Sequence, residues 1–466
     1  MTNGQTQRIL FVTGQLASTP LRSLLERRDP AFEYKVVELP ITVAAFLSVE
    51  WIIPRLVVDE EVDLILLPGW CTGDTAQLEA LTGARVELGP KDLLDIPRWL
   101  GDERKAVSLD EVGTKILAEI VDAPQWPVDA LLAQAEYYRH SGADIIDLGW
   151  PAQGDFPNIL EVLQELKLRG FSVSLDTFHR EDVLRANQAG FDYLLSVNGS
   201  NLEIARMVDC QKVVVMPDFG QGLESLERNV ERLESWGVPY ILDPVVNPLM
   251  FGFTESIARY LETRHRFPDQ EMLMGIANLT ELTDADSAGI NAMLMGIVAE
   301  LGIQYVLTTE VISWAWGAVR EVDAARRLMH FASQHHVLPK DLDDCLIVTK
   351  DLPFDVLSEQ QLREMQTRVR DHNYRIFCDG RQVFVFNATR FIMGTDPKAI
   401  FGQMGLQNDS QQAFYVGREL EKANLAIRLG KRYVQDQPLR WGYLDGHQPG
   451  HTGRQTREHP DPVGPR

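Results

Sequence analysis

The chain has 466 residues, of which 45% are hydrophobic, and a formal net charge of −22 at pH 7. This length predicts two or three domains with sizeable cores. The acidic excess argues against nucleic acid and against an anionic membrane as partners, because both carry negative charge. For the same reason, an anionic substrate would need local cations or a metal ion.

Cysteine usage and hydropathy indicate a cytoplasmic protein. No C-x-x-C pair occurs, so buried free thiols in a reducing compartment are expected. The first apolar run, residues 9–12, is too short for a secretory signal. The most apolar long window, residues 41–58, contains Glu50, Pro54 and Arg55, so no transmembrane helix is expected. The four cysteines are Cys71, Cys210, Cys345 and Cys378.

Residues 1–104 are predicted to form a Rossmann-like α/β domain. Strands are expected at 8–13, 34–39 and 62–67, each ending in turn residues, with a helix at 21–28. The glycine-containing segment 69–75 could offer backbone N–H groups to a phosphate, but an ordinary strand-to-helix turn explains it better. The chain has neither a P-loop motif nor the dinucleotide-binding glycine pattern, so we expect no bound dinucleotide.

Residues 105–337 are predicted to form the central domain, a (β/α)8 TIM-type barrel. A run of eight strand–helix units in about 230 residues is typical of that fold. The alternation would also suit a doubly wound sheet, but eight evenly spaced units favour closure. The expected strands are 116–121, 143–148, 172–176, 193–197, 212–216, 240–243, 272–277 and 305–309.

Residues 338–445 are predicted to form a small α+β appendage. Strands are expected at 346–349 and 375–378, and Asp379-Gly380 is a hairpin turn into a strand at 382–386. A helix is expected at 414–432. Residues 446–466 are rich in Gly, Pro, His and Arg and lack a run of apolar residues, which predicts a disordered tail.

Polar side chains follow most of the barrel strands. In a closed barrel the strand ends meet at one mouth, so these groups should converge there. Carboxylates and amides together complement a planar, guanidine-like ring with N–H and NH2 donors. Metal ligation by the same carboxylates, or plain solvation, are the alternatives. The residues are Asp122, Asp147, Asp176, Asn198, Asp243, Asn278 and Glu310.

Three of these strand ends resemble motifs of the pterin-binding superfamily, which contains dihydropteroate synthases and methyltetrahydrofolate:corrinoid methyltransferases. The matches are Gly142-Ala-Asp-Ile-Ile-Asp-Leu-Gly149, Ser174-Leu-Asp-Thr177 and Ile241-Leu-Asp-Pro244, within a resemblance that covers about residues 110–335. The resemblance implies that the pterin is held by Asp176, Asn198, Asp243 and Asn278. It implies catalytic roles for Asp147, which matches the second-strand aspartate, and for Asp122, which falls where the first strand usually offers an Asn.

The chain also departs from dihydropteroate synthases. It lacks their Ser-Arg-Lys run after strand seven and their Arg-x-His run in strand eight, and Gly275-Ile-Ala-Asn278 is more similar to the methyltransferases. The three-part layout resembles dihydropteroate synthase-like proteins linked to tetrahydromethanopterin biosynthesis. The implied reaction condenses 7,8-dihydropterin-6-ylmethyl diphosphate with an arylamine. A corrinoid-dependent methyltransferase and a non-catalytic pterin-binding protein remain alternatives.

The implied reaction has consequences for cofactors and partners. Mg²⁺ would accompany the diphosphate, and Arg180 and Lys350 are the candidate diphosphate contacts. No residues are assigned as metal ligands. The partners implied are small molecules, a reduced pterin and an arylamine whose identity the sequence leaves open, and a homodimer is a possible assembly.

Overall fold

The structure, a computed structural model, describes residues 7–28, 32–58, 61–100, 109, 112–151, 153–340, 342–406 and 409–445. The chain divides into two compact units, residues 1–106 with 347–441 and residues 107–346 with 442–466. The first unit therefore contains both the predicted N-terminal domain and most of the predicted appendage. The predicted disordered tail, 446–466, lies outside the described residues.

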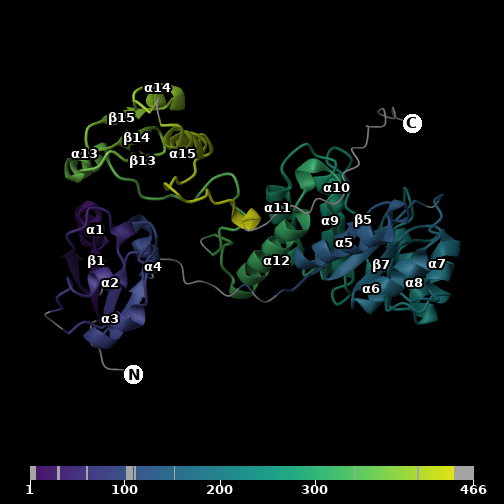
Figure 1. Ribbon diagram of the computed structural model, residues 1–466. Helices are drawn as coiled ribbons and strands as arrows, with labels where there is room; N and C mark the ends of the chain where they lie inside the picture. The colour runs from purple at the N-terminus through teal and green to yellow at the C-terminus, as the bar shows by residue number, and fades with distance from the viewer. Residues whose placement is uncertain are drawn as a thin grey trace. The chain divides into compact units, whose positions relative to one another are not determined.

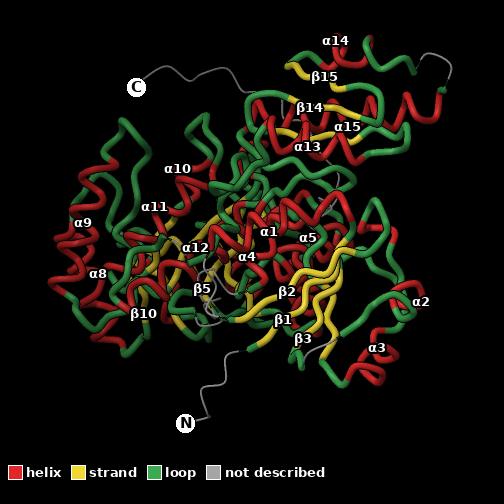
Figure 2. Tube along the Cα trace, turned by 90° about the vertical axis from the view of Figure 1, so that its left-hand side faces the viewer, coloured by secondary structure: helices red, strands yellow, loops and turns green. Residues whose placement is uncertain are grey.

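The N-terminal part of the first unit is a four-stranded parallel sheet in the order β2-β1-β3-β4, and its strands run side by side in Figure 2. The strand β4 was not predicted, because its sequence, Arg-Val-Glu-Leu, has no apolar run. Segment 69–75 leads into α3, whose first turn is capped by the Asp74 carboxylate. The elements are β1 (Arg8–Thr13), α1 (Gln15–Arg28), β2 (Glu33–Glu38), η1 (Ala44–Phe46), α2 (Val49–Ile52), β3 (Leu64–Leu67), α3 (Thr75–Thr82), β4 (Arg85–Leu88), η2 (Leu93–Asp95) and α4 (Ile96–Trp99).

The C-terminal part of the first unit is a three-stranded antiparallel sheet in the order β13-β14-β15. The hairpin predicted at Asp379-Gly380 joins β13 to β14. The strand predicted at 346–349 is wrong: the segment has no strand partner and Ile347 is 36% exposed. The elements are α13 (Glu359–Arg368), β13 (Arg375–Cys378), β14 (Val383–Phe386), β15 (Phe391–Gly394), α14 (Pro397–Gly402) and α15 (Ser410–Leu429).

The second unit is an eight-stranded parallel barrel, as predicted (Figure 1). Its strands follow the order β10-β9-β8-β7-β6-β5-β12-β11, and a parallel bridge between Leu242 and Met272 joins the two outer strands. The strands are β5 (Lys115–Ile120), β6 (Ile145–Gly149), β7 (Ser172–Asp176), β8 (Tyr193–Val197), β9 (Lys212–Val215), β10 (Tyr240–Leu242), β11 (Leu273–Gly275) and β12 (Tyr305–Thr309).

Helices cover the outside of the barrel and form its main core with the outward faces of the strands. Leu163 of α6, Leu233 of α8 and Val298 of α11 have no exposed surface. The helical elements of this unit are η3 (Ala123–Gln125), α5 (Val128–His140), α6 (Ile159–Leu168), α7 (Arg180–Ala186), η4 (Leu202–Arg206), α8 (Leu223–Trp236), α9 (Phe253–Arg266), α10 (Ala277–Thr280), α11 (Ser287–Glu300), η5 (Ser313–Ala315), α12 (Ala318–His335) and η6 (Gly442–Leu444).

The inside of the barrel changes from apolar to acidic along the strands. Leu117, Ile145 and Ile241 belong to one buried cluster contributed by the strands. Side chains two positions apart on a strand point the same way. Glu119 and Asp147 therefore share the inward face, one layer nearer to the C-terminal ends of the strands.

Two further expectations concern cysteines and the membrane. All four cysteines are free thiols, but the expected burial holds for Cys71 alone of the four, and the other three are partly exposed. Within the described ranges, no helix combines the length and the apolar character that crossing a bilayer requires.

Candidate active site

Three carboxylates from neighbouring strands form the centre of the candidate site. Glu119 on β5 pairs in register with Asp147 on β6, and Gly149 on β6 pairs with Asp176 on β7. Oxygen atoms of the three carboxylates all lie within 4.8 Å of one another. Asp147 has no exposed surface, whereas the other two acids are partly exposed. We call Glu119, Asp147 and Asp176 the acidic cluster.

Gly149 makes room for the acidic cluster. A Cβ atom at this position would lie 2.1 Å from Oε1 of Glu119 and 3.0 Å from its Cδ. Any larger residue would therefore have to displace the Glu119 carboxylate. The glycine that ends the β6 motif is thus explained by the side chain of the neighbouring strand.

We expect Gly149→Ala to lower the free energy of unfolding by about 1–3 kcal/mol, because the added methyl group overlaps a partly buried carboxylate. The double variant Gly149→Ala/Glu119→Ala should recover most of that loss, because it removes the clashing group. Urea unfolding of the two single variants and the double variant measures this coupling. Additive effects of the two changes would contradict the proposed contact.

Serine hydroxyl groups hold two of the three carboxylates. Ser174 donates to Asp147 Oδ1 at 2.5 Å, and Ser196 donates to Asp176 Oδ1 at 2.5 Å. Ser196 has a φ of +57° and lies at an irregularity between β8 and β9, so the strand bends where its hydroxyl turns to Asp176. Asp147 Oδ2 is buried and has no hydrogen-bond partner among the described residues.

The acidic cluster holds protons more tightly than isolated carboxyl groups do. Burial, and then the charges of Asp147, Asp176 and Glu281, raise the pKa of Glu119 well above its usual value. Burial and the Asp176 charge also raise the pKa of Asp147 well above its usual value, although the hydrogen bond from Ser174 acts to lower it. Burial also raises the pKa of Asp176, and that of Glu281 to about 7. The physical causes are desolvation and like-charge repulsion.

Asp243 belongs to the same mouth but has partners of its own. Its Oδ1 accepts hydrogen bonds from the Tyr260 hydroxyl at 2.8 Å and from the Val245 backbone N–H at 2.9 Å. Burial raises the pKa of Asp243 to about 6, opposed by these hydrogen bonds and assisted by the charge of Asp176. The negative charge of Asp176 therefore contributes to the raised pKa of Asp243.

The raised pKa of Asp243 predicts a pH dependence of stability. The folded state binds the Asp243 proton more tightly than the unfolded state, so this group's contribution is full below about pH 4 and is lost as the pH rises through about 6. Asp243→Asn should therefore become more stable relative to the parent as the pH rises from 4 to 7. Between pH 4 and pH 7 the free energy of unfolding of the variant relative to the parent should rise by at most about 3 kcal/mol. Solvent screening of the partly exposed carboxylate makes the rise smaller.

Thermal melting of parent and variant at pH 4, 5, 6 and 7 tests this expectation. An Asn oxygen can still accept both hydrogen bonds, so the comparison isolates the charge. A difference in melting temperature that stays constant with pH would contradict it.

The two predicted amide residues differ in their surroundings. Asn198 is 1% exposed, and its Oδ1 accepts from the backbone N–H and the hydroxyl of Ser200. Its Nδ2 is buried and has no hydrogen-bond partner in the described part of the chain. Asn278 is exposed, and its Nδ2 donates to the Val246 carbonyl at 2.9 Å.

Two other predicted residues, Asp122 and Glu310, also lie outside the acidic cluster. Asp122 follows β5 with a φ of +53° and begins the turn into η3, so the acid of this strand that meets Asp147 is Glu119. Glu310 accepts from the Val319 N–H at the start of α12 and from the Tyr137 hydroxyl, which gives it a structural role.

The two predicted diphosphate contacts remain predictions. Arg180 begins α7, and its exposed guanidinium group lies 2.8 Å from the Met207 sulfur. Lys350 is exposed and belongs to the first unit, whereas the acidic cluster belongs to the second.

Several residues of the site were not predicted from the sequence. Glu119 could have been found by counting in steps of two from the apolar residue Leu117, because both face the barrel interior. Tyr260 and Ser196 carry no local signal. Each joins the site only through a hydrogen bond to an aspartate from a different element: Tyr260 of α9 to Asp243, and Ser196 of β8 to Asp176.

Comparisons with known proteins match different parts of the chain. A model described as "Family of unknown function (DUF6513)" matches residues 7–91, in the first unit. The uncharacterized protein MJ0107 of Methanocaldococcus jannaschii is 28% identical over an alignment of 530 positions, and the match covers 93% of this chain and 99% of that protein.

Solved structures similar to this chain include dihydropteroate synthases. The 7,8-dihydropteroate synthase of Vibrio fischeri ES114 is 19% identical, with a TM-score of 0.37, and the match covers 49% of this chain and 96% of that one. The enzyme from Thermus thermophilus is 22% identical, with a TM-score of 0.37 and coverage of 48% and 94%. The Burkholderia cenocepacia enzyme complexed with 7,8-dihydropteroate is 16% identical, with a TM-score of 0.38 and coverage of 48% and 92%.

Proposed function

We propose that the barrel binds a reduced pterin at its mouth. The observation that carries this proposal is a pair of buried polar atoms without partners among the described residues, on the two strands that flank β7: the acceptor Asp147 Oδ2 on β6 and the donor Asn198 Nδ2 just after β8. Buried polar atoms without partners are rare in folded proteins, so they indicate a missing ligand or water. A pterin ring offers both N–H donors and carbonyl or ring-nitrogen acceptors.

The acidic residues would recognise the guanidine-like edge of the ring. Asp176 and Asp243 are partly exposed carboxylates held by Ser196 and Tyr260, so their acceptor atoms are fixed before a ligand arrives. Charge-assisted hydrogen bonds from ring N–H groups would satisfy them. The motifs around both aspartates resemble those of pterin-binding proteins, which supports the same ligand.

The reaction proposed is the condensation of 7,8-dihydropterin-6-ylmethyl diphosphate with an arylamine. The arylamine nitrogen forms a bond to the pterin CH2 carbon, the bond from that carbon to diphosphate oxygen breaks, and the arylamine loses a proton. Asp147 would accept the proton on its buried Oδ2, which has no hydrogen-bond partner among the described residues. The carboxylates of the acidic cluster would stabilise positive charge that develops on the ring and CH2 group.

Mg²⁺ fits the acidic cluster. Carboxylate oxygens are hard ligands of the kind that Mg²⁺ prefers, and Glu119 offers one beside Asp147 and Asp176. Glu119 would hold the ion, which would neutralise charge on the departing diphosphate. This contribution matters here because the chain lacks the lysine and arginine that dihydropteroate synthases carry on strands seven and eight.

The pathway proposed is tetrahydromethanopterin biosynthesis. It is supported by the three-part layout of the chain and by motifs that match the pterin-binding superfamily without its usual cationic pair. An arylamine other than that of ordinary folate synthesis would suit the altered strands seven and eight, where the chain has Gly275-Ile-Ala-Asn278 and Thr308-Thr-Glu310.

Two measurements test the proposed function. Mass spectrometry of the small molecules released from purified protein should detect a reduced pterin. The protein should also release diphosphate from 7,8-dihydropterin-6-ylmethyl diphosphate only when an arylamine is present. Pterin binding with methyl transfer to a corrinoid protein, and without diphosphate release, would replace the synthase by a methyltransferase. Binding without either reaction would leave a pterin-binding protein, and no pterin binding would overturn the proposal.

A further inference from the structure

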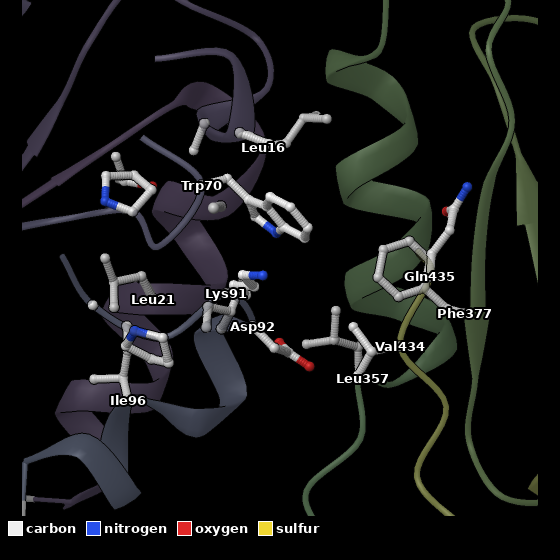
Figure 3. A pocket seen from close by; sticks show the side chains of 18 of the residues that line it. Leu16, Leu21, Trp70, Lys91, Asp92, Ile96, Leu357, Phe377, Val434 and Gln435 are labelled. Atoms are coloured by element: carbon white, nitrogen blue, oxygen red, sulfur yellow. The ribbon is translucent and has the colours of Figure 1, made fainter. Parts of the chain in front are cut away.

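The first unit contains a cavity of its own, which plays no part in the function proposed for the barrel. It has a volume of about 350 Å³ and lies at the C-terminal ends of β1, β3 and β4. Its walls come from both parts of this unit, the parallel sheet and the segment from 354 to 437. Figure 3 shows side chains from both walls around this cavity.

The position of the cavity in the sheet is one where ligands commonly bind. With the strand order β2-β1-β3-β4, the chain moves to one side of β1 to form β2 and to the other side to form β3. The crevice outside the carboxyl ends of parallel strands at such a switch point is the usual binding site of open α/β sheets. Thr13 at the end of β1 and Leu67 at the end of β3 both line the cavity.

Aromatic rings on opposite walls point to a planar ligand. Trp70 follows β3 and is 39% exposed. On the other wall, Phe377 is the end ring of a parallel stack with Phe386 and Phe391, with successive ring centroids 5.6 Å apart and ring planes within 8°. Another flat ring beside Phe377 would continue this stack, which is a favoured arrangement of aromatic groups.

Lys91 supplies a cation for an anionic substituent on that ring. The lining also contains the acids Asp92 and Asp355, Arg375, which is paired with Asp371, and Arg432. Lys91 Nζ lies 4.2 Å from the centre of the Trp70 ring and forms no salt bridge with any residue in the described ranges. Arg432 is different, because it is paired with Asp92 at 2.5 Å and with Asp95. The nearby helix α1 has no acidic residue in its first turn, so its N-terminal dipole adds to the positive potential.

We propose that this cavity binds a small planar aromatic molecule that carries a carboxylate or similar anionic group. Trp70 and Phe377 hold the ring, and Lys91 pairs with the anion. A volume of about 350 Å³ is near the lower end of ligand pockets and suits one or two fused rings. This site is separate from the acidic cluster, because the two belong to different units.

Titration calorimetry on the full chain tests the proposal with 2-naphthoate and its neutral analogue 2-naphthamide. The parent protein should bind 2-naphthoate at least five-fold more tightly than the amide. Trp70→Ala should weaken both ligands at least ten-fold. Lys91→Met should weaken 2-naphthoate about ten-fold and change the affinity for 2-naphthamide less than two-fold.

Two control variants match these changes outside the cavity. Trp51→Ala removes a ring that is likewise covered by a cation, with Arg55 Cζ at 4.2 Å from its centre, and Lys398→Met removes an exposed cation of the same unit. Both should bind the two ligands as the parent does. Absence of saturable binding by the parent, equal affinity for acid and amide, or unchanged binding by Trp70→Ala would overturn the proposal. Circular dichroism of each variant confirms that it is folded.

Discussion

The Asp176→Asn variant should lose between about 30- and 1000-fold in affinity for a dihydropterin. Asp176 is the last residue of β7, and its Oδ1 is already fixed by the Ser196 hydroxyl. The substitution keeps the shape of the side chain but places an NH2 donor where the ligand's N–H group needs an acceptor. Losing a charge-assisted hydrogen bond and leaving a polar group unpaired amounts to roughly 2–4 kcal/mol.

Titration calorimetry with a 7,8-dihydropterin, together with a melting curve, separates binding from folding. The melting temperature should not fall, because Asn can still accept the Ser196 hydrogen bond and the repulsion within the acidic cluster decreases. Asp284→Asn is a suitable control, since Asp284 is an exposed acid between β11 and α11. Unchanged affinity in Asp176→Asn would remove this residue from the site and, with it, the proposed recognition of the guanidine-like edge of the ring.

The Asp147→Asn variant should become more stable while it loses activity. Asp147 is fully buried, and like charges surround it, so its ionised form opposes folding above neutral pH. An Asn side chain would keep the Ser174 hydrogen bond and offer a donor to Glu119 and Asp176. We expect the free energy of unfolding at pH 8 to rise by about 1–2 kcal/mol, which raises the melting temperature by about 2–4 °C per kcal/mol in a domain of this size.

Turnover of the proposed condensation should fall by about 100-fold or more in the same variant, because Asn cannot accept the arylamine proton. Diphosphate release under saturating substrates measures this loss, and the pterin dissociation constant should change less than Asp176→Asn changes it. A variant that is less stable than the parent would show that Asp147 is needed for the fold. A stable variant with full turnover would exclude Asp147 as the general base.

The sequence by itself determined the barrel and most of its elements. Each barrel strand is a short apolar run that ends in a polar or turn residue, and each outer helix has apolar residues at helical spacing, so the strand–helix order could be read locally. A glycine after several of the helices marked their ends; Gly170 and Gly237, for example, both have the positive φ that ends a helix. Local signals failed for β4 and for segment 346–349, where pairing with a neighbouring strand decides the structure.

The tertiary structure alone decided which polar residues meet. Asp122 and Glu119 lie three residues apart. Glu119 is within β5 and its side chain faces the barrel interior, where it meets Asp147 and Asp176, whereas Asp122 lies in the turn after the strand. The raised pKa values also depend on neighbours that come from different strands. The cavity of the first unit was likewise hidden from the sequence, because one wall belongs to residues before 100 and the other to residues after 350. Packing between segments so distant in the chain leaves no periodic pattern in either of them.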